Sequence, residues 1–166
     1  MTDQRANSPG GASNEGKPLS PDELGFQLEV RRQRLVQIRA MVHSQANIFH
    51  ESYNFDVGES DLGYCCDVVC DLLNRSTASL EPLCDSLREA GEPKEPLRLS
   101  RIIEGIRQQL WRSEAVLQAV ANLMRSRKFT EPEANLKMVM DTILEMLDDQ
   151  ISELEPLNLG LPVPLP

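Results

Sequence analysis

Residues 99–124 read LSRIIEGIRQQLWRSEAVLQAVANLM, and this stretch decides the fold. Apolar residues recur in it at steps of three and four, the spacing that places them along one face of an α-helix. The residues on the a and d positions of this heptad pattern are Leu99, Ile103, Ile106, Leu110, Leu117, Val120 and Met124. Only Ser113 interrupts the stripe. The stretch therefore predicts a long amphipathic helix that buries one face.

The same period returns in three other segments of the chain. The first helix carries Leu28, Leu35, Ile38, Val42, Ala46 and Phe49, the second carries Leu62, Cys66, Val69, Leu73, Leu80, Leu83 and Leu87, and the fourth carries Leu136, Met140, Ile143, Leu147, Ile151 and Leu154. A helix with one apolar stripe needs other helices to cover it, so we expect the four helices to share a single core.

Turn-forming residues mark the limits of these helices. Ser20, Pro21 and Glu23 form the pattern of a capping box with proline in the first turn, and this pattern predicts a helix start. Residues 130–133 repeat that pattern before the fourth helix. We divide the chain into a disordered tail over 1–19, a helical hairpin over 20–90, a linker over 91–96, a second hairpin over 97–157 and an apolar, proline-rich tail over 158–166.

The two hairpins repeat each other in sequence. At a shift of 75 positions, Leu24, Glu29, Arg32, Gln33, Leu35, Ala40, Ala46 and Asn47 are identical to Leu99, Glu104, Arg107, Gln108, Leu110, Ala115, Ala121 and Asn122. At a shift of 74, residues 80–83 match residues 154–157, and both stretches read LEPL. Polar matches do not follow from a shared apolar period, so we predict an internal duplication. The predicted fold class is all-α, a four-helix bundle of two tandem hairpins, with the helix order and hand left open.

The overall charge and composition limit the kinds of partner. The formal net charge is -9, whereas nucleic-acid binding needs clustered cations, so no nucleic-acid partner is expected. No apolar run approaches the roughly 20 residues of a membrane span, and no signal-peptide core is present near the start. The four cysteines, all within 65–84, make a poor disulfide framework. We therefore expect a soluble cytoplasmic protein whose partner is another protein, without membrane contact.

The cysteines and histidines suggest a metal site. Cys66 and Cys70 are four residues apart on a helix, and His43 is expected nearly level with them in an antiparallel hairpin, which would supply three zinc ligands. The duplication argues against this site, because it matches the cysteines to core positions. Cys65, Cys66 and Cys70 match Val139, Met140 and Leu144. Cysteine acting as a small buried apolar residue is favoured, and we predict no metal ligand and no cofactor.

No arrangement typical of an enzyme is present in the sequence. The chain holds two histidines, His43 and His50, both on the first helix, which leaves little material for a nucleophile with an adjacent base. Neither has a glutamate three residues before it, as a di-iron carboxylate bundle requires. There is also no glycine-rich phosphate loop. We expect no catalytic residues and no enzymatic activity.

Two regions are candidates for contact with another protein. Trp111 follows the core position of Leu110 at the edge of the stripe, beside Arg112, and such a half-exposed indole either caps the core or anchors an interface. Leu159, Leu161 and Val163 alternate with other residues in the proline-rich tail. This tail is expected to dock as an extended segment, on its own bundle or on another chain.

Two arginines of the repeat are further candidates. Arg32 and Arg107 occupy matching positions, each three residues after a glutamate, Glu29 or Glu104. They either pair helices within the bundle or present two equivalent polar surfaces to a partner.

The segments Gln109–Leu117 and Met140–Leu147 resemble small helical-hairpin proteins of unknown function from proteobacteria. The resemblance covers the second half of the chain. It implies a Gram-negative bacterial source, and it implies no activity or binding residue, because that group has no assigned chemistry.

From these features we predict a non-enzymatic protein-interaction module, such as an adaptor, a regulator or a chaperone-like binder. The alternative is a metal- or redox-responsive helical protein that uses Cys65, Cys66 and Cys70. A third reading is that the bundle associates with copies of itself through exposed heptads, which would make a homo-oligomer.

Overall fold

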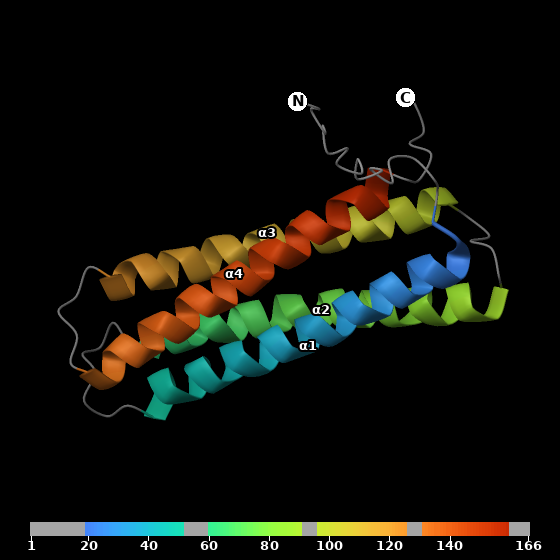
Figure 1. The fold of residues 1–166 in the computed structure, drawn as a ribbon. Coiled ribbons are helices and arrows are strands. Elements are labelled where there is room, and N and C mark those ends of the chain that lie inside the picture. The colour runs from blue at the N-terminus through green and yellow to red at the C-terminus, as the bar shows by residue number, and fades with distance from the viewer. Residues whose placement is uncertain (1–18, 52–59, 91–95, 126–130, 160–166) are drawn as a thin grey trace, which may run out of the picture.

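The protein is a bundle of four long α-helices (Figure 1). The computed structural model describes residues 19–51, 60–90, 96–125 and 131–159. The helices are α1 (Pro21–Glu51), α2 (Ser60–Ala90), α3 (Pro96–Arg125) and α4 (Glu131–Leu159), and the described residues contain no strand. The predicted all-α four-helix fold is confirmed. The predicted N-terminal tail, apart from Leu19, lies outside the described residues.

The predicted capping box begins α1. The Ser20 backbone N–H donates to Glu23 Oε2 at 2.8 Å, and the Glu23 N–H donates back to Ser20 Oγ at 3.3 Å. The Leu24 N–H donates to the Ser20 carbonyl at 2.9 Å and closes the first turn. Two N–H groups that a helix start leaves without partners are thereby satisfied, and this fixes where α1 begins.

The four helices form a closed ring of neighbours. α1 packs against α2, α2 against α3, α3 against α4, and α4 against α1, whereas over the described residues the Cα atoms of diagonal helices stay more than 8 Å apart. Successive helices run in opposite directions, so the last residues of α1 and α3 and the first residues of α2 and α4 lie at the same end of the bundle (Figure 1). We call this the hairpin-tip end. The ring settles the helix order, which the sequence had left open.

The predicted apolar stripes line the interior of the bundle. All the stripe residues are buried except Leu83 and Leu136, which are half-buried and pack against the core. Full burial of one leucine side chain contributes about 2 kcal/mol to folding, so this shared core is what holds the two hairpins together. Over the described residues, no helix has the length and apolar character needed to cross a membrane.

Positions related by the two sequence shifts also agree in burial. Every stripe position of α1 is matched 75 residues later by a buried residue of α3. The buried polar residues follow the same rule. Ser76 matches Gln150 at the shift of 74, and both are buried. Ser113 matches Ile38 at the shift of 75, and both are buried. The two hairpins therefore present equivalent faces to the core, while the duplication itself stays a prediction.

Candidate functional site

The cysteines lie inside the bundle. Cys66, Cys70 and Cys84 are buried, Cys65 is half-buried, and all four are free thiols. Burial raises the pKa of the Cys66 thiol to about 12 and the pKa values of Cys70 and Cys84 to about 11. Because the thiolate is the form that binds metals and attacks electrophiles, the raised pKa values disfavour both roles for these three thiols.

The zinc ligands considered from the sequence are not brought together. Cys66 and Cys70 face the core, whereas His43 is exposed on α1. Over the residues that the structure describes, no group of three His, Cys, Asp or Glu side chains is placed to hold a metal ion. The metal-responsive alternative therefore has no assembled ligand set in this part of the chain.

The other histidine joins the two helices of the first hairpin. His50 Nε2 on α1 lies 3.0 Å from Asp67 Oδ2 on α2, and its ring packs edge-on against Tyr64. Gly63 leaves room for this ring, because a Cβ at that position would lie 2.6 Å from it. The second hairpin has an ion pair at the matching positions, between Arg125 of α3 and Asp141 of α4.

The polar residues repeated in both hairpins also interact within the bundle. Arg32 donates two hydrogen bonds to Glu29, at 2.9 and 2.8 Å. Although burial opposes it, this bonding to the Arg32 guanidinium lowers the pKa of the Glu29 carboxyl to about 2. In the second hairpin Arg107 lies 3.5 Å from Glu104 and 4.0 Å from Glu155 of α4. Both arginines thus have partners inside the chain, and their contact with another protein stays a prediction.

Trp111 and Arg112 are both exposed on α3. Trp111 is 45% exposed, and the Arg107 guanidinium lies over its ring at 4.6 Å, on the flank of α3 that faces α4. Successive residues are rotated by about 100° around a helix, so Arg112 lies further toward the α2 side of α3. Contact of the two residues with another protein stays a prediction. The side chains of Leu159, Leu161 and Val163 lie outside the described residues.

A different surface follows the seam between α2 and α3. The Ser76 hydroxyl of α2 lies 2.8 Å from Gln109 Oε1 of α3 and marks this seam. The seam continues from there toward the hairpin-tip end. On α2 it is followed by residues at steps of four before Ser76, and on α3 by residues at steps of seven after Gln109. These residues are Leu72 and Val68 on α2 and Val116 and Leu123 on α3, whereas Tyr64, one step further along α2, packs against His50 of α1. Val68 and Leu123 are each 53% exposed, so this half of the surface is apolar.

The other half of the same surface carries arginines. Arg75 comes seven residues after Val68 on α2, and Arg112 comes four residues before Val116 on α3. Arg98 and Arg101 lie further along α3, away from the hairpin tips. All four arginines are exposed, and none of them pairs with an acidic residue among those that the structure describes. We call the combined apolar and basic surface the α2/α3 face.

An equivalent surface lies on the opposite side of the ring, along the seam between α4 and α1. Arg31 of α1 pairs with Glu153 of α4 at 3.1 Å on this seam. One face of α4 carries exposed residues at steps of four, three and four: Met138, Thr142, Glu145 and Asp149. We call this surface, together with Met41 and Ile48 of α1, the α4/α1 face.

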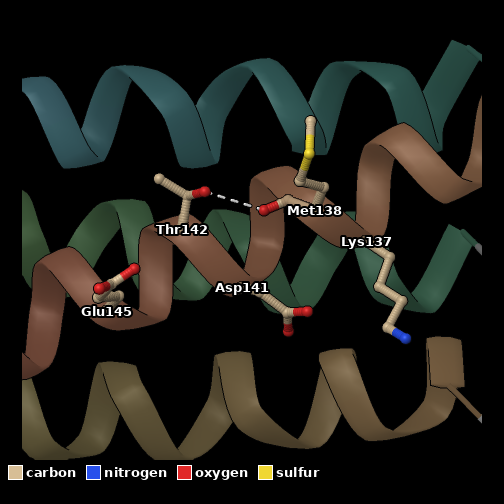
Figure 2. A pocket seen from close by; sticks show the side chains of 5 residues that line it. All are labelled: Lys137, Met138, Asp141, Thr142 and Glu145. Atoms are coloured by element: carbon tan, nitrogen blue, oxygen red, sulfur yellow. Dashed lines mark hydrogen bonds between the residues drawn. The ribbon is translucent and has the colours of Figure 1, made fainter.

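Figure 2 shows how the side chains of α4 divide between its neighbours. Met138 points toward α1, whereas Lys137 and Asp141 point toward α3. These residues, with Thr142 and Glu145, line a shallow depression on the surface of α4. The Thr142 hydroxyl donates to the Met138 carbonyl at 3.0 Å and is therefore occupied. An open depression of this kind suits contact with another macromolecule better than enclosure of a small ligand.

Comparisons with protein families, with curated proteins and with solved structures give no match to this chain. The resemblance to proteobacterial helical-hairpin proteins therefore stays a prediction.

Sequence reasoning missed the exposed apolar residues next to the core stripes. Tyr64 and Val68 precede the half-buried Leu72 at steps of four, which is a signal that the sequence does contain. That row turns slowly away from the core because four residues exceed one helical turn of 3.6. Its partner Leu123 lies on another helix, and only the ring order of the helices places the two rows side by side.

Proposed function

We propose that this chain is a non-enzymatic protein-binding module that acts through its α2/α3 face. The observation that carries the proposal is the combination of exposed Val68 and Leu123 with four exposed arginines on one side of the bundle. Clustered exposed apolar side chains typically mark an interaction site on a protein of this size. Arginine is also a residue type enriched where proteins meet.

Two further features support this proposal. The polar groups repeated in both hairpins, such as Glu29 and Arg32, bond to each other, which leaves them a structural role. The thiols of Cys66 and Cys84 are buried and protonated, which favours a structural role over the redox-responsive alternative. Four unpaired cysteines also support a reducing location, so we propose that the protein works in the cytoplasm as an adaptor, regulator or chaperone-like binder.

The test is a comparison of variants of the full chain as bait in a lysate of the source organism. We expect the wild-type chain to retain a protein in stoichiometric amounts and the double variant Val68→Asp with Leu123→Asp to lose it. Both residues are exposed, so the variant should keep its helicity by circular dichroism. The control is Val36→Asp, on the other flank of the bundle, where the exposed fraction is 38%. Retention of the same protein by all three baits, or by none, would contradict the proposal.

A further inference from the structure

A partner for the α2/α3 face needs apolar side chains and carboxylates on one surface. The α4/α1 face of the same chain carries both, since Met138, Glu145 and Asp149 are exposed on it. We infer that the α2/α3 face binds the α4/α1 face of a second copy of this protein. The inference rests on the proposed function and names the partner. In the ring of helices these two faces lie on opposite sides, so neither can cover the other within one chain.

The ring order of the helices decides which residues meet when two copies pack side by side in the same orientation: α2 of one copy lies on α1 of the next, and α3 lies on α4. Val68 of α2 and Ile48 of α1 are exposed, and so are Leu123 of α3 and Met138 of α4. All four lie in the half of their helices nearest the hairpin-tip end. Two copies that pack side by side in the same orientation therefore bring apolar residues against apolar residues.

The charged parts of the two faces have opposite sign where α3 of one copy meets α4 of the next. Exposed Arg112 lies near the middle of α3, and the exposed carboxylates of Glu145 and Asp149 lie near the middle of α4.

Each face also carries minority charges. Asp61 and Asp71 lie on the α2/α3 face, and Arg34, the counterpart of Gln109 at the shift of 75, lies on the α4/α1 face. The balance of basic and acidic residues nevertheless differs between the two faces, since α4 has Lys137 as its one basic residue. Exposed arginines of one copy thus meet exposed carboxylates of the next, and such complementarity selects both partner and orientation.

This geometry predicts the form of the assembly. Each copy in a pair uses one face and leaves the other uncovered, so a further copy can bind in the same way. The mass should therefore increase progressively with protein concentration instead of stopping at a dimer. Added salt should weaken the assembly, because the arginine–carboxylate contacts are solvent-accessible before binding.

An anionic membrane surface is the competing occupant for a patch of arginines beside apolar residues. The net charge of -9 opposes approach to such a membrane. In binding to a second copy, the basic α2/α3 face instead contacts the acidic α4/α1 face directly, so opposite charges lie close together at the interface. We therefore argue for the second copy and treat membrane binding as an outcome of the test.

The experiment measures the mass of the full chain by sedimentation velocity over a wide range of concentrations at low salt. We expect Arg112→Glu and Asp149→Arg each to weaken association by about tenfold or more, because each places like charges opposite one another. An equal mixture of the two variants should recover association. The unmodified faces still fit each other, and the new glutamate meets the new arginine.

Asp148→Arg is the matched control, because it makes the same charge change one residue away, on the flank of α4 that faces α3. It should associate like the wild-type chain. A chain that stays monomeric at all concentrations, variants that associate unchanged, or a monomer that cosediments with vesicles of anionic phospholipid would each overturn the inference. If the chain stays monomeric but captures another protein through Val68 and Leu123, the proposed function stands and the self-association fails.

Discussion

Replacing Glu29 by glutamine tests whether the repeated polar residues hold a hairpin together. Glu29 accepts two hydrogen bonds from Arg32 and one from the Gln33 amide at 3.1 Å. Its side chain is 15% exposed and that of Arg32 is 29% exposed. Glutamine keeps the size of the side chain but removes its charge, so Arg32 is left half-buried without its anion.

The exposure of the pair sets the expected loss of stability. A hydrogen bond to a well-sheltered charged group contributes about 1.5–3 kcal/mol, whereas an exposed pair on one helix contributes about 0.3–0.5 kcal/mol. The Glu29 pair lies between these cases, so Glu29→Gln should lower the free energy of unfolding by about 1–2 kcal/mol. The matched control is Glu104→Gln, because Glu104 lies 3.5 Å from Arg107 and is 34% exposed. We expect it to cost under about 0.5 kcal/mol.

Urea unfolding followed by circular dichroism, repeated at decreasing pH, measures both losses. The pKa of Glu29 in the folded chain is about 2, below its ordinary value of 4.5. The stability that this carboxylate contributes is therefore fully present above pH 4.5 and is lost as the pH falls toward 2. The difference between the wild-type chain and Glu29→Gln should shrink over that range. Equal losses for the two variants, or a difference that acid leaves unchanged, would refute the reasoning.

Three further predictions concern the core and its edge. Leu110→Ala should lower the free energy of unfolding by about 2–5 kcal/mol, because Leu110 is fully buried, and a loss below about 1 kcal/mol in urea unfolding would contradict the shared core. In thiol titration under native conditions, the half-buried Cys65 should react first and the buried Cys66 only at the rate of unfolding, and immediate reaction of Cys66 would contradict its burial. Gly63→Ala should displace the His50 ring, seen as shifted imidazole signals in NMR spectra, at a cost under about 1 kcal/mol, and an unchanged ring would contradict the close approach.

The core was predictable because burial on a helix follows from local spacing. The residues from Leu99 to Met124 recur with the helical period, and every one of these stripe positions is buried. The matching of Cys66 to Met140 also gave the right environment for that cysteine, since both residues are buried. Local periodicity says which face of a helix is covered, and for these positions that was enough.

The α2/α3 face was not predictable in the same way, because it depends on which helices are neighbours. Val68 and Leu123 are on separate helices, and the linker between the hairpins allowed more than one ring order. Trp111 drew attention as the one tryptophan of the chain, yet its ring lies over Arg107 on another flank. A residue type suggests an interface, but only the packing shows which exposed residues share a surface.

Among the residues that the structure describes, the arginines of the α2/α3 face have no acidic partner. The chain has 26 acidic residues against 17 basic ones, so carboxylates able to pair with Arg75 or Arg112 are plentiful. Within each hairpin, by contrast, Arg32 and Arg125 are paired. Unpaired arginines beside exposed apolar residues become stabilising once an acidic, partly apolar surface covers them, and Met138 and Asp149 form part of such a surface on every copy of this chain.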